Sequence, residues 1–369
     1  MSAFPIPEPR LQHVRNWTPY VVFDCDKMGP GRRFFDTLVV KGTFVLAEGV
    51  LRRAAEQAPL ELADTVWDPE NAERSSLKHA GEVVLVKPST DVLVTGTARP
   101  AKEARASWSA SVSVRRAGEL VVEHRAEVRG PRVWRHVGGA WRLGPSAATD
   151  AVPIRYERAY GGAYLAPVRS GEPPPDLPWV THRENPSGTG FFDLEALDPA
   201  LEYRAPEWEE AGDPVTEMGR AVALAGFGPV ARPWTSRLDH CGTYDAAWER
   251  AAKADIERGL PADYAADFDP RFFQCAHPGL ITPSYLEGDE EVTLTGLLPG
   301  EEPFVTRLPG VSVVARMIDG AGEGHVEPMA LDTVHFDLDQ ERVYLCWRIT
   351  LDQERGVRSA LVQEERMGR

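Results

Sequence analysis

The sequence predicts a mainly β protein with few helices, made of two antiparallel, β-sandwich-like lobes joined by a long irregular connector. Runs of β-branched and aromatic residues, some with period-two alternation, occur toward both ends of the chain. The 369 residues include 32 glycines and 31 prolines, which interrupt helices and favour short elements linked by ordered loops. Long helical bundles are therefore excluded.

The N-terminal lobe is expected over residues 1–143. Residues 106–115 alternate apolar side chains with serines, which is the pattern of a half-buried antiparallel strand. Gly118 then turns the chain into a second strand over residues 120–128. Further strands are expected at residues 35–46, 83–86 and 92–97, with a short aromatic hairpin at residues 132–141.

Residues 144–240 form the expected connector, in which prolines alternate with aromatic residues, a texture that favours an ordered wrap over a flexible linker. Residues 241–369 form the C-terminal lobe. It begins with a helix over residues 243–258, capped by Thr243 and ended by Gly259 and Pro261. Its strands are expected at residues 292–298, 311–317, 333–338 and 343–351. These three segments are also compatible with one compact unit.

A short similarity between the lobes leaves duplication open. Residues 91–96 (D-V-L-V-T-G) resemble residues 291–296 (E-V-T-L-T-G), and each run is followed by a proline. Descent from one ancestral β unit and chance similarity of two strand–turn segments explain this equally well.

The charge balance restricts the partners. Lys and Arg number 41 against 56 Asp and Glu, a net charge of −15. Such a surface repels nucleic acid and anionic membranes and suits a basic protein partner. The first residues lack the basic and apolar regions of a signal peptide, and the four cysteines are scattered like reduced thiols. We therefore expect a soluble, cytoplasmic protein.

The sequence contains no catalytic signature that we can identify. It has no nucleophile elbow or phosphate loop, and its nine histidines show no ligand spacing. In the Asp239-His240-Cys241 run, neighbouring side chains usually point apart, and Asp263, Asp267 and Asp269 are expected to cap their own turns. We expect no enzyme activity, cofactor or metal. The alternative is a β-rich hydrolase acting on carbohydrate or ester, since tryptophans stack on sugars and paired carboxylates cleave them. A plain binding module is a third possibility.

Several motifs occur in a fixed order. Residues 87–96 begin K-P-x-x-D and continue as an apolar strand. The others are Arg132-Val133-Trp134 with Trp141-Arg142-Leu143, Y-E-R-A-Y-G-G at 156–162, N-P-S-G-T-G-F at 185–191, G-F-G-P at 226–229, G-T-Y-D at 242–245 with Trp248, and D-F-D at 267–269. Together they resemble a bacterial family of domains of unknown function, described as adaptors or chaperones of type VI secretion effectors.

The resemblance implies a protein that binds a secreted effector and helps to place it on the secretion spike, of VgrG or PAAR type. It implies no catalytic residues. Within the connector, Arg155, Tyr156, Glu157, Arg158 and Tyr160 are the candidates for partner contact. An architectural role is the preferred interpretation, with tyrosines buried under a loop and Glu157 paired with a neighbouring arginine.

Overall fold

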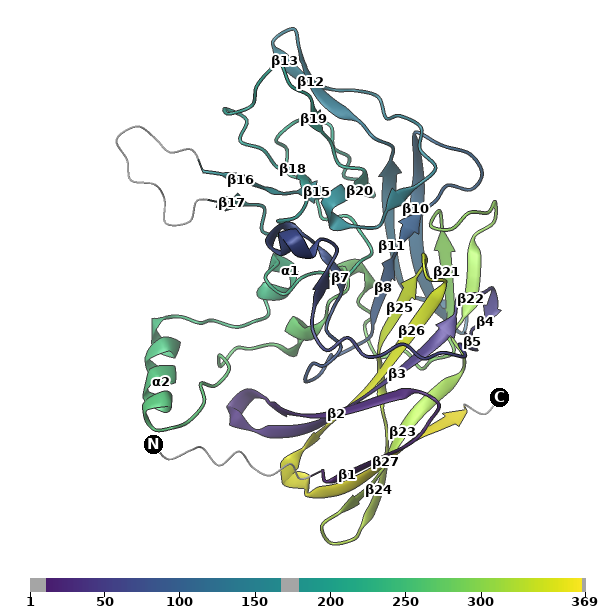
Figure 1. Ribbon diagram of the computed structural model, residues 1–369, viewed down its shortest axis with the longest axis vertical. Coiled ribbons are helices and arrows are strands. Elements are labelled where there is room, and N and C mark those ends of the chain that lie inside the picture. The colour runs from purple at the N-terminus through teal and green to yellow at the C-terminus, as the bar shows by residue number, and fades with distance from the viewer. Residues whose placement is uncertain (1–10, 167–178, 367–369) are drawn as a thin grey trace.

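The computed structural model describes residues 11–166 and 179–366, so the N-terminal residues 1–10 and the connector prolines at 173–175 lie outside the described residues. Most of the described elements are strands, and the mainly β fold is confirmed (Figure 1). The α-helices among these residues are α1 (Thr235–Leu238) and α2 (Ala246–Glu257). None of the helices described is long and apolar enough to cross a membrane.

Three larger sheets make up the body of the protein (Figure 1). The central sheet has the order β2 (Val21–Met28), β3 (Phe34–Val45), β26 (Arg342–Asp352), β25 (Ala330–Asp337) and β8 (Asp91–Thr95), with β5 (Arg52–Arg53) also on β3. The upper sheet has the order β20 (Trp208–Glu210), β11 (Glu119–Arg129), β10 (Ser107–Arg116), β21 (Glu291–Thr295), β22 (Phe304–Arg307) and β4 (Gly49–Val50). The lower sheet has the order β1 (His13–Trp17), β27 (Val357–Arg366), β23 (Val311–Asp319) and β24 (Gly324–Pro328).

Shorter strands pair around this body. One small sheet contains β13 (Ala140–Leu143), β12 (Val133–Val137) and β19 (Tyr203–Arg204). The two-stranded pairs are β14 (Val152–Pro153) with β9 (Thr97–Ala98), β15 (Tyr160–Gly161) with β18 (Thr189–Gly190), β16 (Ala163–Leu165) with β17 (Trp179–Thr181), and β6 (Thr65–Val66) with β7 (Leu77–His79). Short strands of the connector are therefore ordered by pairing with one another, as in β15–β18 and β16–β17, or with strands of the N-terminal segment, as in β14–β9 and β19–β12.

The two expected lobes are interleaved. β3 from the N-terminal segment pairs antiparallel with β26 from the C-terminal segment, and β8 pairs in parallel with β25. β10 likewise pairs with β21 in the upper sheet. The expected division at residues 143 and 240 therefore does not separate independent sheets, because each large sheet needs strands from both ends of the chain.

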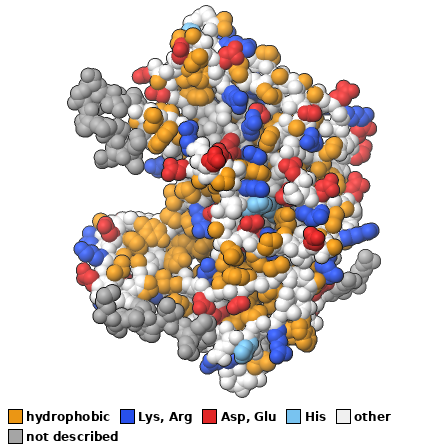
Figure 2. Space-filling view, in the orientation of Figure 1, with side chains coloured by type: hydrophobic (Ala, Val, Ile, Leu, Met, Phe, Trp, Pro, Cys, Tyr) orange, Lys and Arg blue, Asp and Glu red, His pale blue; other side chains and the backbone are white. Residues whose placement is uncertain are grey.

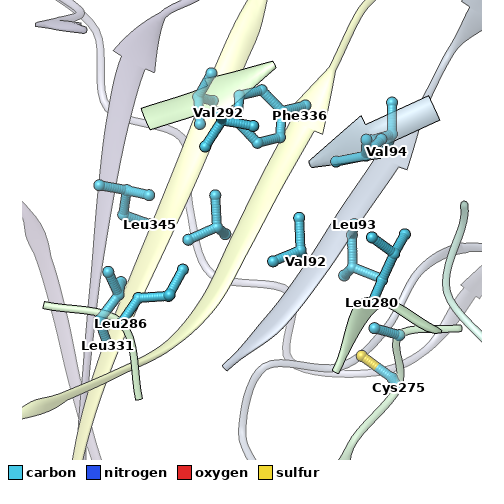
Figure 3. Packing of buried hydrophobic residues seen from close by; sticks show 14 of the residues in the cluster. Val92, Leu93, Val94, Cys275, Leu280, Leu286, Val292, Leu331, Phe336 and Leu345 are labelled. Atoms are coloured by element: carbon cyan, nitrogen blue, oxygen red, sulfur yellow. The ribbon is translucent and has the colours of Figure 1, made fainter. Parts of the chain in front are cut away.

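One buried core takes side chains from all three larger sheets. Val292 of β21 and Phe336 of β25 belong to one buried cluster and lie together in Figure 3, with Val92 of β8 and Leu345 of β26 nearby. Period-two alternation predicts this packing well at β10, where Trp108 and Val112 are buried. The lobes share one core.

One expected strand is irregular in the structure. Residues 83–86 contain the buried Val84 and Leu85 but form no ladder. Instead, the guanidinium of Arg348 donates to the carbonyls of Val84 (2.9 Å) and Glu82 (2.8 Å), and the hydroxyl of Thr350 donates to that of Leu85. Side chains of β26 thus satisfy the backbone of this segment, a solution that apolar patterning does not distinguish from a strand.

A buried ion pair underlies the K-P-x-x-D motif. Lys87 Nζ lies 2.8 Å from Asp91 Oδ2 and donates to Thr333 Oγ1 at 2.9 Å. The same carboxylate oxygen accepts the backbone N–H of Cys275 at 2.8 Å. Burial opposes the charged ammonium, but the carboxylate of Asp91 more than offsets this and holds the pKa of Lys87 above its ordinary value. The pair therefore joins β8, β25 and the segment around residue 275.

The connector motifs also lock together. Asn185 is fully buried, and its side-chain amide donates to the carbonyls of Tyr156 (2.8 Å) and Tyr160 (3.0 Å). Gly161 has φ +147°, and a Cβ at this position would lie 2.1 Å from the carbonyl oxygen of Asn185. Only glycine allows the Y-E-R-A-Y-G-G and N-P-S-G-T-G-F runs to approach this closely.

We predict that Lys87→Met lowers the free energy of unfolding by about 3–5 kcal/mol, because the substitution leaves Asp91 buried without its cation. Chemical denaturation measures this change. The control is Lys102→Met, whose ion pair with Glu301 is mostly exposed and whose loss should change stability by no more than about 1 kcal/mol. Equal effects of the two substitutions would contradict a structural role for the buried pair.

We predict that Gly161→Val destabilises the fold by at least about 1–3 kcal/mol, since strained φ and a clash with the Asn185 backbone add together. The matched control is Gly324→Val on the exposed strand β24, where the nearest atom to an added Cβ is the Met317 carbonyl oxygen at 4.0 Å. Urea melts of both variants test this. A Gly161→Val melt that matches the control would show that the connector adapts.

Candidate functional site

A helical arm, defined here as residues 239–273, extends from the body at the left of Figure 1 and includes α2. The expected helix is present, but its start and its cap differ from the expectation. The Asp245 side chain caps α2 by accepting the backbone N–H groups of Ala247 and Trp248, both at 2.9 Å. Thr243, the expected cap, lies before the helix and bonds elsewhere.

The base of the arm is closed by residues from two motifs. The backbone N–H and hydroxyl of Thr243 donate to the carboxylate of Asp267 at 2.8 and 2.7 Å. These bonds hold the pKa of Asp267 below its usual value, so this carboxylate is ionised at neutral pH. Gly242 has φ +88°, and its missing side chain leaves room for Ala265. The G-T-Y-D and D-F-D runs therefore fix where the arm begins and ends.

A buried arginine anchors the same base. Arg237 is 3% exposed, and its guanidinium donates to the carbonyls of Val230 and Phe272, each at 3.0 Å. Val230 precedes the arm in the sequence, and Phe272 lies near its end. Arg237 thus joins the entry and exit of the arm.

The arm also contacts the turn between β2 and β3. The backbone N–H of Gly31 donates to Asp263 Oδ1 at 2.9 Å, and Arg32 Nε donates to the Pro261 carbonyl at 3.0 Å. The Arg32 guanidinium forms an ion pair with Asp255 of α2. The turn therefore supports the arm from the side of the central sheet.

Between the arm and this turn lies a groove of about 630 Å³. Its apolar lining includes Trp248, Ala251 and Tyr264. Four carboxylates lie around it, those of Asp245, Asp255, Asp263 and Asp267. Arg32 also lines the groove and pairs with Asp255, so the lining combines apolar side chains, carboxylates and one guanidinium.

Large apolar side chains are exposed on and beside the arm. Ile256 is 62% exposed, Tyr244 47% and Leu238 46%. Figure 2 shows hydrophobic side chains gathered on the arm and along the hollow beside it. Trp248, Ala252 and Ile256 recur along α2 at helical spacing, and the body covers them only in part: Ala252 is buried, whereas Ile256 faces solvent.

The five connector candidates divide by burial. Tyr156 and Tyr160 are 2% and 3% exposed, and the Tyr156 hydroxyl donates to the Gly228 carbonyl at 3.0 Å. Both rings therefore lie inside the protein, away from any partner. Arg155, Glu157 and Arg158 line a separate surface cavity of about 340 Å³.

The expected ion pair between Glu157 and a neighbouring arginine is wrong, because Glu157 bonds to Ser76 instead. Its carboxylate accepts the backbone N–H of Ser76 at 2.7 Å and the Ser76 hydroxyl at 2.5 Å. Arg158 pairs with Glu207 at 2.7 Å, and Arg155 lies 3.9 Å from the centre of the Trp67 ring. These contacts fasten the connector to residues distant in sequence.

The other chemical candidates are used structurally. His240 Nδ1 lies 3.8 Å from Asp269, and the Cys241 thiol donates to the Gly242 carbonyl at 3.3 Å. Asp269 accepts the N–H of Arg271 and caps a short 3-10 turn, as expected. The sequence predicts Asp263 and Asp267 as turn caps but does not predict the groove. The groove depends on the contact between Pro30–Arg32 and the arm, which the sequence pattern does not reveal.

Comparison with known proteins gives one match. The model of a family described as an uncharacterized protein conserved in bacteria (DUF2169) matches residues 32–348, which is more than half of the chain and includes the connector and the arm. No curated protein and no solved structure matches the chain. The chain therefore belongs to the conserved bacterial family DUF2169.

Proposed function

We propose that this protein is a cytoplasmic adaptor, or chaperone, that binds a type VI secretion effector and helps to load it on the VgrG or PAAR spike. The ordered motifs that resemble such adaptors fall within the span matched by the family model. The observation that carries the proposal is the groove between the arm and the Pro30–Arg32 turn, whose lining combines apolar side chains with carboxylates and includes three residues of the G-T-Y-D and D-F-D motifs. In this proposal the protein holds its client and catalyses no reaction.

The surface around the groove favours a protein ligand. Ile256, Tyr244 and Leu238 extend the apolar area beyond the groove itself, and exposed patches of this kind mark interaction sites. Carboxylates in the lining, such as that of Asp245, favour a client segment that carries Lys or Arg beside an apolar anchor. The net charge of −15 acts in the same direction at long range.

We predict that co-expression with the effector encoded beside this gene gives a complex that survives gel filtration and raises the soluble yield of the effector. An unrelated effector is the control. Raised salt should slow association with a basic client, because the steering charge is screened. Binding of neither effector, or equal binding of both together with turnover of glycans or esters, would replace the adaptor proposal by the hydrolase alternative.

We predict that Ile256→Glu weakens effector binding by tenfold or more, since it places a charge on the apolar surface beside the groove. Val326→Glu is the matched control: Val326 is also about half exposed, at 53%, but it lies on β24 of the lower sheet. Binding is measured by titration calorimetry, and thermal melts check that both variants fold. Equal loss in both variants, or no loss in Ile256→Glu, would show that the client binds elsewhere.

A further inference from the structure

Three chemically active side chains from distant parts of the chain meet beside the upper sheet. Glu210 of β20 lies in the register position next to Ala126 of β11, and His124 lies two residues along β11 on the same face. His277 precedes the short 3-10 turn Pro278–Leu280, and its ring stacks on that of His124 with centroids 4.0 Å apart. Donor atoms of His124, Glu210 and His277 lie within 4.8 Å of one another.

Two of these atoms face each other without a protein hydrogen-bond partner. His124 is 5% exposed, and its Nε2 atom is buried and unpartnered. The same is true of Glu210 Oε2, which lies 3.6 Å from that nitrogen. Buried polar atoms are nearly always paired, so two in contact with the same small space require an explanation.

The 3.6 Å distance between His124 Nε2 and Glu210 Oε2 can be compared with the distances expected for a shared proton, a bridging water or a metal ion. It is too long for a direct O–H···N bond, which needs about 2.5–3.0 Å. It is too short for one bridging water, whose two hydrogen bonds would hold the acceptors about 4.5 Å apart. Two ligands of one tetrahedral metal ion, with bonds of about 2.0–2.2 Å, lie about 3.4 Å apart.

We propose that His124, Glu210 and His277 form a binding site for one divalent transition-metal ion of the zinc class, with His124 Nε2 and Glu210 Oε2 as its first two ligands. Nitrogen and carboxylate donors suit zinc, cobalt or nickel and do not suit calcium, which takes oxygen alone.

His277 joins the site once its ring gives up both backbone contacts and turns out of its stack on His124, because its Nδ1 accepts an N–H and its Nε2 therefore carries the ring proton. Its Nε2 now contacts the Leu224 carbonyl at 3.0 Å, and its Nδ1 accepts the N–H of Gly279 at 3.1 Å. An ion held this way joins β11, β20 and the residue-277 turn, so it would stabilise the fold by mass action. The site is independent of the proposed adaptor function.

Calorimetric titration of the chelator-treated full chain with zinc chloride tests this proposal, with cobalt(II) absorption reporting the ligand geometry. We expect one equivalent of metal per chain, a raised melting temperature and a tetrahedral cobalt spectrum. Glu210→Gln, His124→Gln and His277→Gln should each weaken binding tenfold or more. Because the Glu210 side chain is 26% exposed, Glu210→Gln should remain folded even if a histidine variant does not.

The matched control is His325→Ala, which removes a ligand from the other cluster found among the described residues, that of Asp319, Glu323 and His325 at the turn between β23 and β24. This variant should bind zinc like the wild type. Absence of saturable zinc binding by the wild type would overturn the proposal. So would binding that persists in a folded Glu210→Gln variant or that disappears in His325→Ala.

Discussion

The buried ion pair between Lys87 and Asp91 is the interaction on which the arrangement of the sheets depends. Asp91 begins β8, which ends the central sheet as a parallel partner of β25. A parallel end strand must be covered on its free edge, and here the Val94 N–H donates to the Phe227 carbonyl at 2.9 Å. The same carboxylate that pairs with Lys87 also accepts the N–H of Cys275, so one buried charge positions β8 against both chain segments that enclose it.

Polar side chains of the other motifs hold distant segments of the chain together in the same way. Asn185 holds the two connector runs together, and the Thr243–Asp267 contact closes the arm. In each case a short polar side chain satisfies backbone groups that irregular structure leaves without ladder partners. These side-chain contacts hold irregular segments of the chain in place. They also fix the position of the groove beside the arm.

How much of this the sequence predicts depends on the range of the interaction. β10 could be predicted because alternation is local, and the helix because its end signals are local. The irregular path of residues 83–86 could not, since Arg348 and Thr350 supply its partners from the far end of the chain. Nor could the interleaving of the lobes, because the pairing of β3 with β26 is set by the whole fold and leaves no trace in either strand.

The same reasoning explains why the candidate sites escape a reading of the sequence. Two of the groove carboxylates, those of Asp263 and Asp267, are visible as turn residues, but their place in the lining of a groove depends on the turn at Pro30–Arg32. His124, Glu210 and His277 show no ligand spacing because a strand, its neighbour and a distant turn each contribute one residue. Ligand spacing in a sequence detects sites built on one element. In a fold whose sheets combine both ends of the chain, a site assembles across elements, and unpartnered buried atoms reveal it where spacing cannot.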